Sequence, residues 1–209
     1  NNSINEIYNQ KKISKSRVEK IIEDSRKTLL NIRNKKVKPN TDYKFISSWN
    51  SLIISSLCNT YNITSDKNYL TQAIYTAESI LENFIEDEIL FHTKNNKIAF
   101  LEDYSYFTNA LFDLYNSSQS SRWYDIAKTM CEGTINRFWS SKDNLFYDTF
   151  ESNDLIIRPK GFFDPMIPNP AAIAAQNAYR LYRYSNDSKY LDIVGKSLKT
   201  VSGLLDKSP

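Results

Sequence analysis

The sequence predicts an all-α fold made of stacked helical hairpins, and three observations support this. First, 14 Tyr and 11 Phe stand against only 4 Gly and 6 Pro, a balance that favours long helices packed through aromatic side chains. Second, apolar residues recur at helical spacing through most of the chain. Third, the pattern repeats along the sequence. At 209 residues the chain is long enough for one domain or a large part of one.

The repeat is visible in pairs of aromatic residues. Three tyrosines are each followed, eight residues later, by a second aromatic residue: Tyr61 by Tyr69, Tyr115 by Trp123, and Tyr182 by Tyr190. Repeats of this size indicate units that bury a face only against their neighbours. We therefore expect three helical hairpins, with the long polar connections at one end of the array and the short Ser/Asn/Asp breaks at the other.

Each expected helix begins or ends at a recognisable signal. Ser16 and Glu19 have the spacing of a capping box, and Asn169 followed by Pro170 is typical of a helix start. The helices are expected over residues 16–33, from 49 to about 61, over 69–84, from 104 to about 115, over 123–139, from 169 to about 184, and from 187 or 188 to about 205.

Two β-hairpins are expected between the helical hairpins. In the first, residues 89–93 and 97–100 flank Asn95 and Asn96, which suit a tight turn. In the second, residues 145–150 and 155–158 flank a polar turn at residues 152–154. The stretch from Arg158 to Pro168 is too rich in proline for regular structure.

Composition excludes several function classes. The net charge of +3 comes from 27 basic and 24 acidic residues spread along the chain, so no nucleic-acid partner and no membrane partner is expected. Cys58 and Cys131 fall on apolar stripes and are interpreted as buried free thiols. Together with the absence of a signal-peptide pattern in the polar first residues, these features predict a soluble cytoplasmic protein.

Five short motifs carry a resemblance to a known family. They are Asp42-Tyr43-Lys44, Trp49-Asn50, Phe100-Leu101-Glu102-Asp103-Tyr104, Arg158-Pro159-Lys160, and Asp164 before a Pro-bearing loop into a helix. In their order and spacing they resemble the thioredoxin domain-containing proteins of the YyaL and spermatogenesis-associated type. The resemblance covers about residues 16–205.

The resemblance implies a particular architecture. Such a protein has an N-terminal thioredoxin-like domain followed by an (α/α)6 toroid, similar to N-acylglucosamine 2-epimerases and six-hairpin glycosidases. This chain would be an interior section of the toroid, with about seven of its helices. Residues 14–209 would then be a partial toroid domain behind a polar, flexible stretch over residues 1–13. The thioredoxin-like domain, which is not part of this sequence, would be a partner.

Three acids are the candidate catalytic residues: Glu102, Asp103 and Asp164. One carboxyl group at the mouth of a helical toroid can act as a general acid or base on a sugar, with Asp164 across the cleft. The structural alternative is that Glu102 and Asp103 satisfy free backbone donors in the first turn of a helix. Since neighbours on a helix point about 100° apart, one of the two can face the cleft while the other caps.

Seven residues are candidates for substrate binding: Asp42, Lys44, Trp49, Asn50, Tyr104, Arg158 and Lys160. Trp49 offers a stacking face to a sugar ring and Asn50 offers hydrogen bonds, although a tryptophan at a helix start is more often part of a core. The two cations can bind an anionic group or pair with Asp164. His92, the only histidine, is interpreted as a surface or packing residue.

The chemistry beyond a sugar cleft stays open. The sequence lacks a phosphate-binding Gly loop and any metal-ligand spacing, so no cofactor and no metal are expected. A single histidine disfavours the paired histidines of sugar epimerases. The alternative function is a non-catalytic scaffold that binds a protein partner, and it is favoured by a loop after Asp164 that departs from the family pattern. Uncovered apolar flanks predict self-association.

Overall fold

The computed structural model describes residues 14–95, 97–151, 155–164 and 166–205, and the chain forms two compact units, residues 1–43 and 44–209. The unit boundary falls inside the domain expected over residues 14–209. The flexible stretch expected over residues 1–13 lies outside the described residues. The first unit contains helix α2 (Lys15–Asn34). Its apolar side chains are largely exposed, and Leu29 is 67% accessible to solvent.

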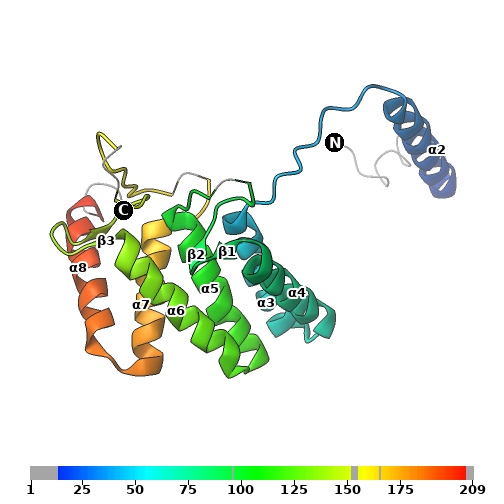
Figure 1. Ribbon diagram of the computed structural model, residues 1–209. Helices are drawn as coiled ribbons and strands as arrows, with labels where there is room; N and C mark the ends of the chain where they lie inside the picture. Colours follow the sequence, from blue (N-terminus) through cyan, green and yellow to red (C-terminus); the bar gives the residue numbers. More distant parts are fainter. Residues whose placement is uncertain (1–13, 96, 152–154, 165, 206–209) are drawn as a thin grey trace. The chain divides into compact units, whose positions relative to one another are not determined.

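The second unit is an array of three helical hairpins (Figure 1). Their helices are α3 (Ser47–Thr64) and α4 (Lys67–Asn83), α5 (Leu101–Ser118) and α6 (Ser121–Phe138), and α7 (Pro170–Ser185) and α8 (Ser188–Leu205). Helices α3, α5 and α7 pack against one another as one layer, and each also packs against its hairpin partner in the other layer. The predicted all-α fold and the positions of its helices are confirmed.

The repeat seen in the sequence corresponds to one recurring corner. Helices α3, α5 and α7 each end in a residue with left-handed backbone geometry, whose N–H donates to the carbonyl of the repeat tyrosine four residues earlier. The bonds are Ser65 to Tyr61 at 2.7 Å, Gln119 to Tyr115 at 2.8 Å, and Asn186 to Tyr182 at 2.7 Å. Such a residue ends a helix and satisfies a free carbonyl. The three corners lie together at the lower end of the array (Figure 1).

The first β-hairpin lies earlier in the chain than expected. Strand β1 (Ile85–Glu86) pairs with β2 (Ile89–Leu90). Asp87 and Glu88 between them both have positive φ, the geometry of a tight two-residue turn whose twist matches the strands. The expected arms over residues 89–93 and 97–100 form no strand pair in the described residues, although the His92 N–H donates to the Ile98 carbonyl at 2.8 Å. Asn96, in the expected turn, lies outside the described residues.

The second hairpin is displaced in the same way. Strand β3 (Trp139–Ser140) pairs with β4 (Leu145–Phe146), directly after helix α6. The Ser140 hydroxyl donates to the Asp143 carboxylate at 2.7 Å, which closes the turn. The turn expected at residues 152–154 lies outside the described residues. The Arg158 side chain of one expected arm donates to the Thr149 carbonyl of the other at 2.8 Å, and the Asp148 N–H donates to the carbonyl of Pro159, just beyond the second arm, at 2.9 Å.

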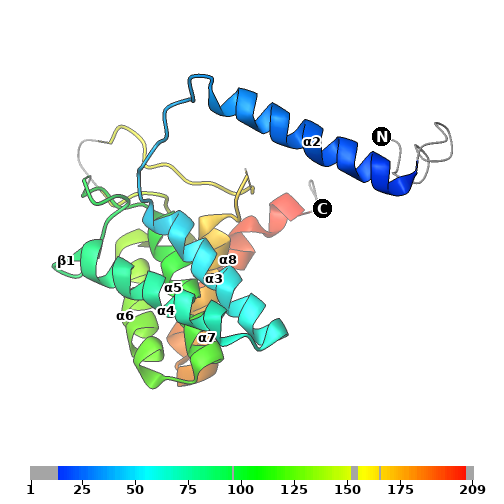
Figure 2. The ribbon, with the colours of Figure 1, turned by 90° about the vertical axis from the view of Figure 1, so that its right-hand side faces the viewer.

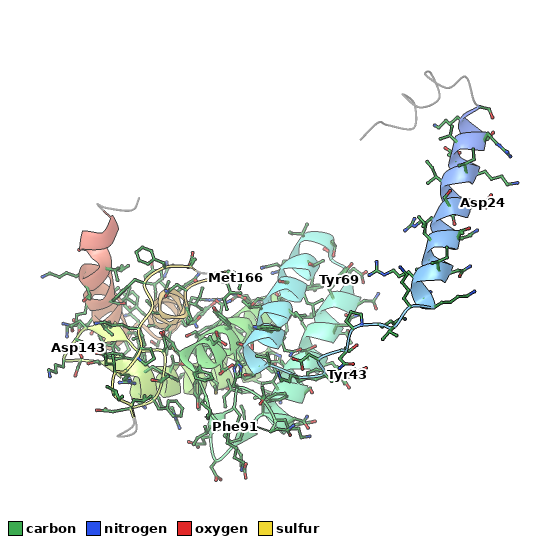
Figure 3. The ribbon with its side chains drawn as sticks, turned by 90° about the horizontal axis from the view of Figure 1, so that it is seen from above. Asp24, Tyr43, Tyr69, Phe91, Asp143 and Met166 are labelled. Carbon is green, nitrogen blue, oxygen red and sulfur yellow. The ribbon has the colours of Figure 1, made fainter. Side chains whose placement is uncertain are left out.

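The long connections lie together at the other end of the array, as Figures 1 and 2 show. Two isolated β-bridges join them to the helix starts, one between Ile46 and Thr93 and one between Phe100 and Thr149. Seen from this end, Phe91 and Met166 mark two different connections (Figure 3). The expected segregation of long and short connections is therefore confirmed.

Helix α5 forms the centre of the array. It packs against α3, α4, α6 and α7, and eleven of its eighteen residues are buried, among them Phe107 and Phe112. Buried aromatic side chains of this size contribute most of the apolar area that stabilises a core. Within the described residues, none of the helices has the length and apolar character needed to cross a bilayer.

Candidate functional site

Asp103 is the buried anchor of the acid pair at the start of α5. Its side chain is fully buried. Its Oδ1 accepts a hydrogen bond from the Ser47 hydroxyl at 2.8 Å, and its Oδ2 accepts one from the Phe100 N–H at 3.0 Å. The second bond satisfies a free donor at the helix N-terminus. Asp103 therefore fixes the junction between α3 and α5 and holds a negative charge beneath the surface.

Glu102, the neighbour, faces outward. Its side chain is 26% exposed, and its Oε1 accepts a hydrogen bond from the Ser48 hydroxyl at 3.2 Å. Burial raises the pKa of the Glu102 carboxyl above its ordinary value, and the negative charge of Asp103 raises it further. The two acids thus divide the roles, with one capping the helix and the other open to ligands.

His92, interpreted from the sequence as a surface or packing residue, also belongs to the same cluster. Its Nδ1 lies 3.0 Å from Oδ1 and 3.2 Å from Oδ2 of Asp103, and 3.8 Å from Oε1 of Glu102. The ring also packs edge-on against Phe100 with 5.2 Å between centroids. Because Nδ1 faces Asp103, Nε2 is the nitrogen left to meet a ligand.

Asp148 supplies a second carboxyl group from the connection between α6 and α7. Its backbone carbonyl accepts a hydrogen bond from the Leu101 N–H at 2.9 Å, which ties this connection to the start of α5. Burial raises the pKa of the Asp148 carboxyl, while a hydrogen bond from the Gly161 backbone opposes the rise. Sequence reasoning did not single out this residue.

His92 and Asp148, whose place in the site was not predicted, stand in a sequence pattern that occurs twice. His92 stands in Phe91-His92-Thr93 and Asp148 in Tyr147-Asp148-Thr149, two copies of an aromatic-x-Thr pattern. Their carbonyls play matching parts, because His92 accepts from the Ser47 N–H at 3.0 Å as Asp148 accepts from the Leu101 N–H. The two side chains are therefore equivalent positions of successive repeats.

These groups open into a pocket of about 400 Å³, which we call the acidic pocket. It is lined by His92, Phe100, Glu102, Asp148, Gly161, Phe163, Asn169 and Pro170. The lining combines polar side chains with aromatic and proline side chains. A pocket with a few convergent polar groups and perturbed carboxyls is the usual form of a small-ligand site.

Asp164, the third catalytic candidate, holds the start of α7 instead of lining the acidic pocket. Its Oδ1 accepts a hydrogen bond from the Asn169 N–H at 2.6 Å. The Asn169 side chain in turn accepts from the N–H groups of Ala171 at 2.9 Å and Ala172 at 3.0 Å. The second carboxyl that lines the pocket, with that of Glu102, belongs to Asp148.

The expected pairing of Arg158 or Lys160 with Asp164 does not occur in the described part of the chain. Arg158 donates to the carbonyls of Thr149 and Arg137, both at 2.8 Å, because the connection brings these carbonyls within reach of its planar group. The Lys160 ammonium lies 5.9 Å from the centroid of the Tyr147 ring. Both cations thus hold the loop in place.

The remaining candidates are divided between the two units and the core. Trp49 is 59% exposed on the first turn of α3 and is not among the described residues that line the acidic pocket. The Asn50 side chain donates to the Ile46 carbonyl at 2.8 Å. Asp42 belongs to the first unit and Lys44 begins the second.

Tyr104, another substrate-binding candidate, is fully buried and is not among the described residues that line the acidic pocket. Its hydroxyl accepts a hydrogen bond from the Leu90 N–H at 3.0 Å, and its ring packs edge-on against Phe138. On the helix, Tyr104 points into the core because it lies two positions beyond Glu102.

A metal ion has one set of candidate ligands among the described residues. His92, Glu102 and Asp103 each offer an atom, and these atoms lie within 4.8 Å of one another. Asp103, however, already accepts the hydrogen bonds of Ser47 and Phe100, so its oxygens serve the fold. That no metal is bound stays a prediction.

Relatives in sequence agree with the resemblance read from the motifs. The chain is 25% identical to an uncharacterized protein of Caenorhabditis elegans over 94% of its length. It is 23% identical to human spermatogenesis-associated protein 20 and 25% identical to the rat protein, in both cases over 78% of its length. The chain spans about a quarter of the length of these relatives, namely 28% and 23%. No family model matches the chain.

Solved structures with the same fold are enzymes that act on sugars. An inactive variant of an α-1,6-mannanase from Salegentibacter, in complex with α-1,6-mannotetrose, matches 84% of this chain and 52% of its own, with a TM-score of 0.63 and 17% identity. Cellobiose 2-epimerase from Bacillus thermoamylovorans matches 76% of this chain and 44% of its own, with a TM-score of 0.61 and 15% identity. The chain thus has the α/α-toroid fold of six-hairpin glycosidases.

Proposed function

We propose that the acidic pocket binds a carbohydrate, and that Glu102 acts there as the acid–base group with Asp148 as the second carboxyl. One observation carries the proposal. Two carboxyl groups with raised pKa values, one from the first turn of α5 and one from the connection between α6 and α7, line one open pocket beside His92. Paired carboxyls of this kind are the machinery of glycoside hydrolysis.

The roles follow from the two environments. A carboxyl group whose pKa is raised holds its proton closer to neutral pH and can donate it to a glycosidic oxygen. Glu102 fits this role because Asp103 behind it disfavours a second negative charge. Asp148 would then act on the other face of the sugar. His92, oriented through its Nδ1 by Asp103, would present Nε2 to a hydroxyl group.

The structural neighbours support this proposal. One mannanase is described as inactive when two consecutive aspartates are replaced, and this chain also carries two consecutive acids, Glu102 and Asp103, at the pocket. Neighbours with the fold bind α-1,6-linked mannose oligomers. Fold alone does not determine function, so the pocket chemistry has to carry the argument.

Binding measurements on three variants test the proposal. A panel of mono- and oligosaccharides is titrated into the protein and into Glu102→Gln, Asp148→Asn and Asp164→Asn, each first shown to be folded by circular dichroism. Loss of at least tenfold in affinity is expected for the first two. Asp164→Asn is the matched control, because Asp164 itself does not line the pocket and an asparagine keeps an acceptor oxygen for the Asn169 N–H. Equal affinities in all three variants would refute the assignment.

An interaction scaffold remains the second candidate, because a further groove favours it. This groove, of about 410 Å³, lies between α7 and α8 and is lined mainly by apolar side chains such as Phe162, Tyr179 and Leu198. Apolar surface of this kind is typical of contacts with protein. Its partner would be the thioredoxin-like domain that the resemblance implies, and binding of that domain without any sugar affinity would favour this candidate.

We also propose a cytoplasmic location for the protein. Cys58 and Cys131 are both free and buried, which is typical of proteins from reducing compartments. Fractionation of cells that produce the tagged protein would test the location.

A further inference from the structure

We infer that the acidic pocket selects uncharged or amine-bearing saccharides and rejects sugar phosphates and sugar acids. This inference rests on the proposed carbohydrate function and adds the charge class of the ligand. It follows from the negative charge of the pocket lining. It also follows from the contacts that already engage nearby cations and the N–H groups of two helix N-termini.

The charge around the pocket is predominantly negative. Glu102 and Asp148 line it directly, and the fully buried Asp103 lies behind Glu102. Among the described lining residues, His92 is the one that can carry a positive charge. Its Nδ1 already faces the Asp103 carboxylate at 3.0 Å, so any charge on the ring is largely offset by that acid.

Three basic residues on the connections, Arg158, Lys160 and Lys97, have contacts of their own. Arg158 donates to two backbone carbonyls, and the Lys160 ammonium lies over aromatic rings, 5.8 Å from the centroid of Phe162. Lys97 forms an ion pair with Glu86 on the hairpin. A phosphate in the pocket would therefore need one of these cations to give up its present contacts.

Two helix N-termini reach the pocket, and acceptors within the protein already take up several of their N–H groups. Helix N-termini are ready anion sites because their first N–H groups lack partners. At the start of α5, the Asp103 carboxylate takes up the Phe100 N–H. At the start of α7, the Asn169 side chain accepts from two N–H groups, and Asp164 accepts from the N–H of Asn169 itself. An anionic ligand would have to displace these internal acceptors.

Repulsion by the pocket carboxylates is large enough to decide selectivity. A ligand anion about 6 Å from one ionised carboxylate, at an effective dielectric constant of about 20, loses roughly a hundredfold in affinity. Salt and partial protonation of the carboxyls weaken the repulsion, so we expect the loss of affinity to be at least tenfold. Sugar hydroxyls donate hydrogen bonds to the same carboxylates, and an ammonium group gains from them. The apolar face of a sugar ring can pack on Phe100 and Phe163.

Matched ligands that differ only in charge test the inference. A hexose, its 6-phosphate, the corresponding hexuronic acid and the corresponding 2-amino sugar are titrated into the protein at low salt and neutral pH. The hexose and the amino sugar are expected to bind, and both anions to bind at least tenfold more weakly. Higher salt should narrow the difference between neutral and anionic sugars.

Variants then locate the source of the selectivity. In Glu102→Gln and Asp148→Asn, the affinity ratio of hexose to hexose 6-phosphate should fall at least threefold. Asp125→Asn removes an exposed carboxyl near the start of α6, at the opposite end of the array, and should keep the ratio of the parent protein. Binding of the phosphate equal to or tighter than that of the hexose would overturn the inference and leave the proposed function standing. If saccharides of every charge fail to bind, the proposed function itself falls.

Discussion

Replacing Asp103 by asparagine should destabilise the protein strongly, although the two side chains have nearly the same shape. The carboxylate is fully buried and accepts hydrogen bonds from Ser47, Phe100 and His92 through both of its oxygens. An asparagine keeps one acceptor oxygen and turns an NH2 group toward a donor. Each hydrogen bond to a charged group contributes about 1.5–3 kcal/mol. The expected loss for Asp103→Asn is therefore about 2–3 kcal/mol.

Truncation at the same position should cost more. Asp103→Ala leaves the Phe100 N–H and the Ser47 hydroxyl without their buried acceptor, and losses of about 3–5 kcal/mol are typical when a buried charged partner is removed. Urea unfolding followed by circular dichroism measures both free energies of unfolding.

Glu102→Gln is the matched control, because it also replaces a carboxyl group by its amide, at the adjacent residue. Glu102 is 26% exposed and accepts one side-chain bond at 3.2 Å, so a change within about 1 kcal/mol is expected. The reasoning would be refuted if the two amides had equal effects, or if Asp103→Asn cost less than about 1 kcal/mol.

Three further outcomes are expected. Burial raises the pKa of Glu102, so the folded state holds the carboxyl proton more tightly than the unfolded chain does. The protonated carboxyl therefore stabilises the fold below its ordinary pKa, and this stabilisation is lost as pH rises through the folded pKa. Glu102→Gln should therefore gain stability relative to the parent protein as pH rises above about 4.5, and pH-dependent urea titrations that run parallel would contradict this. Burial raises the pKa of Cys58 to about 11 and that of Cys131 to about 12, so both thiols should react with a thiol reagent at pH 8 only on unfolding; rapid labelling of the native protein would count against their burial. The exposed apolar residues of α2 and the groove between α7 and α8 should cause self-association, which sedimentation velocity over a concentration series can detect; a constant monomer would oppose it.

The helices could be predicted because their signals are local. Apolar spacing and the repeat tyrosines lie within single helices, and the corners at Ser65, Gln119 and Asn186 recur with the same geometry. The β-hairpins were placed wrongly because each strand is only two residues long. Such short strands carry no alternating pattern, and the turn at Asp87 and Glu88 lacks the glycine or asparagine that usually marks positive φ.

The candidate site was only half visible for a different reason. Glu102 and Asp103 stand out as charges at a helix start, and helical spacing alone predicts that they face different ways. His92 and Asp148 reach the site only because bridges at Ile46 and Phe100 draw distant connections together. Contacts of that kind form only in the assembled array, so they cannot be predicted from a single stretch of sequence.

Helix α5 also has a consequence for how this pocket could change over evolution. One wall is built on the most enclosed helix of the array, where Glu102 and Asp103 adjoin a core that tolerates few replacements. The facing wall, with Gly161 and Phe163, belongs to an irregular connection that can accept insertions and substitutions at little cost to stability. Descendants of this chain could therefore acquire new ligands by altering that connection, while Glu102 keeps its place on α5.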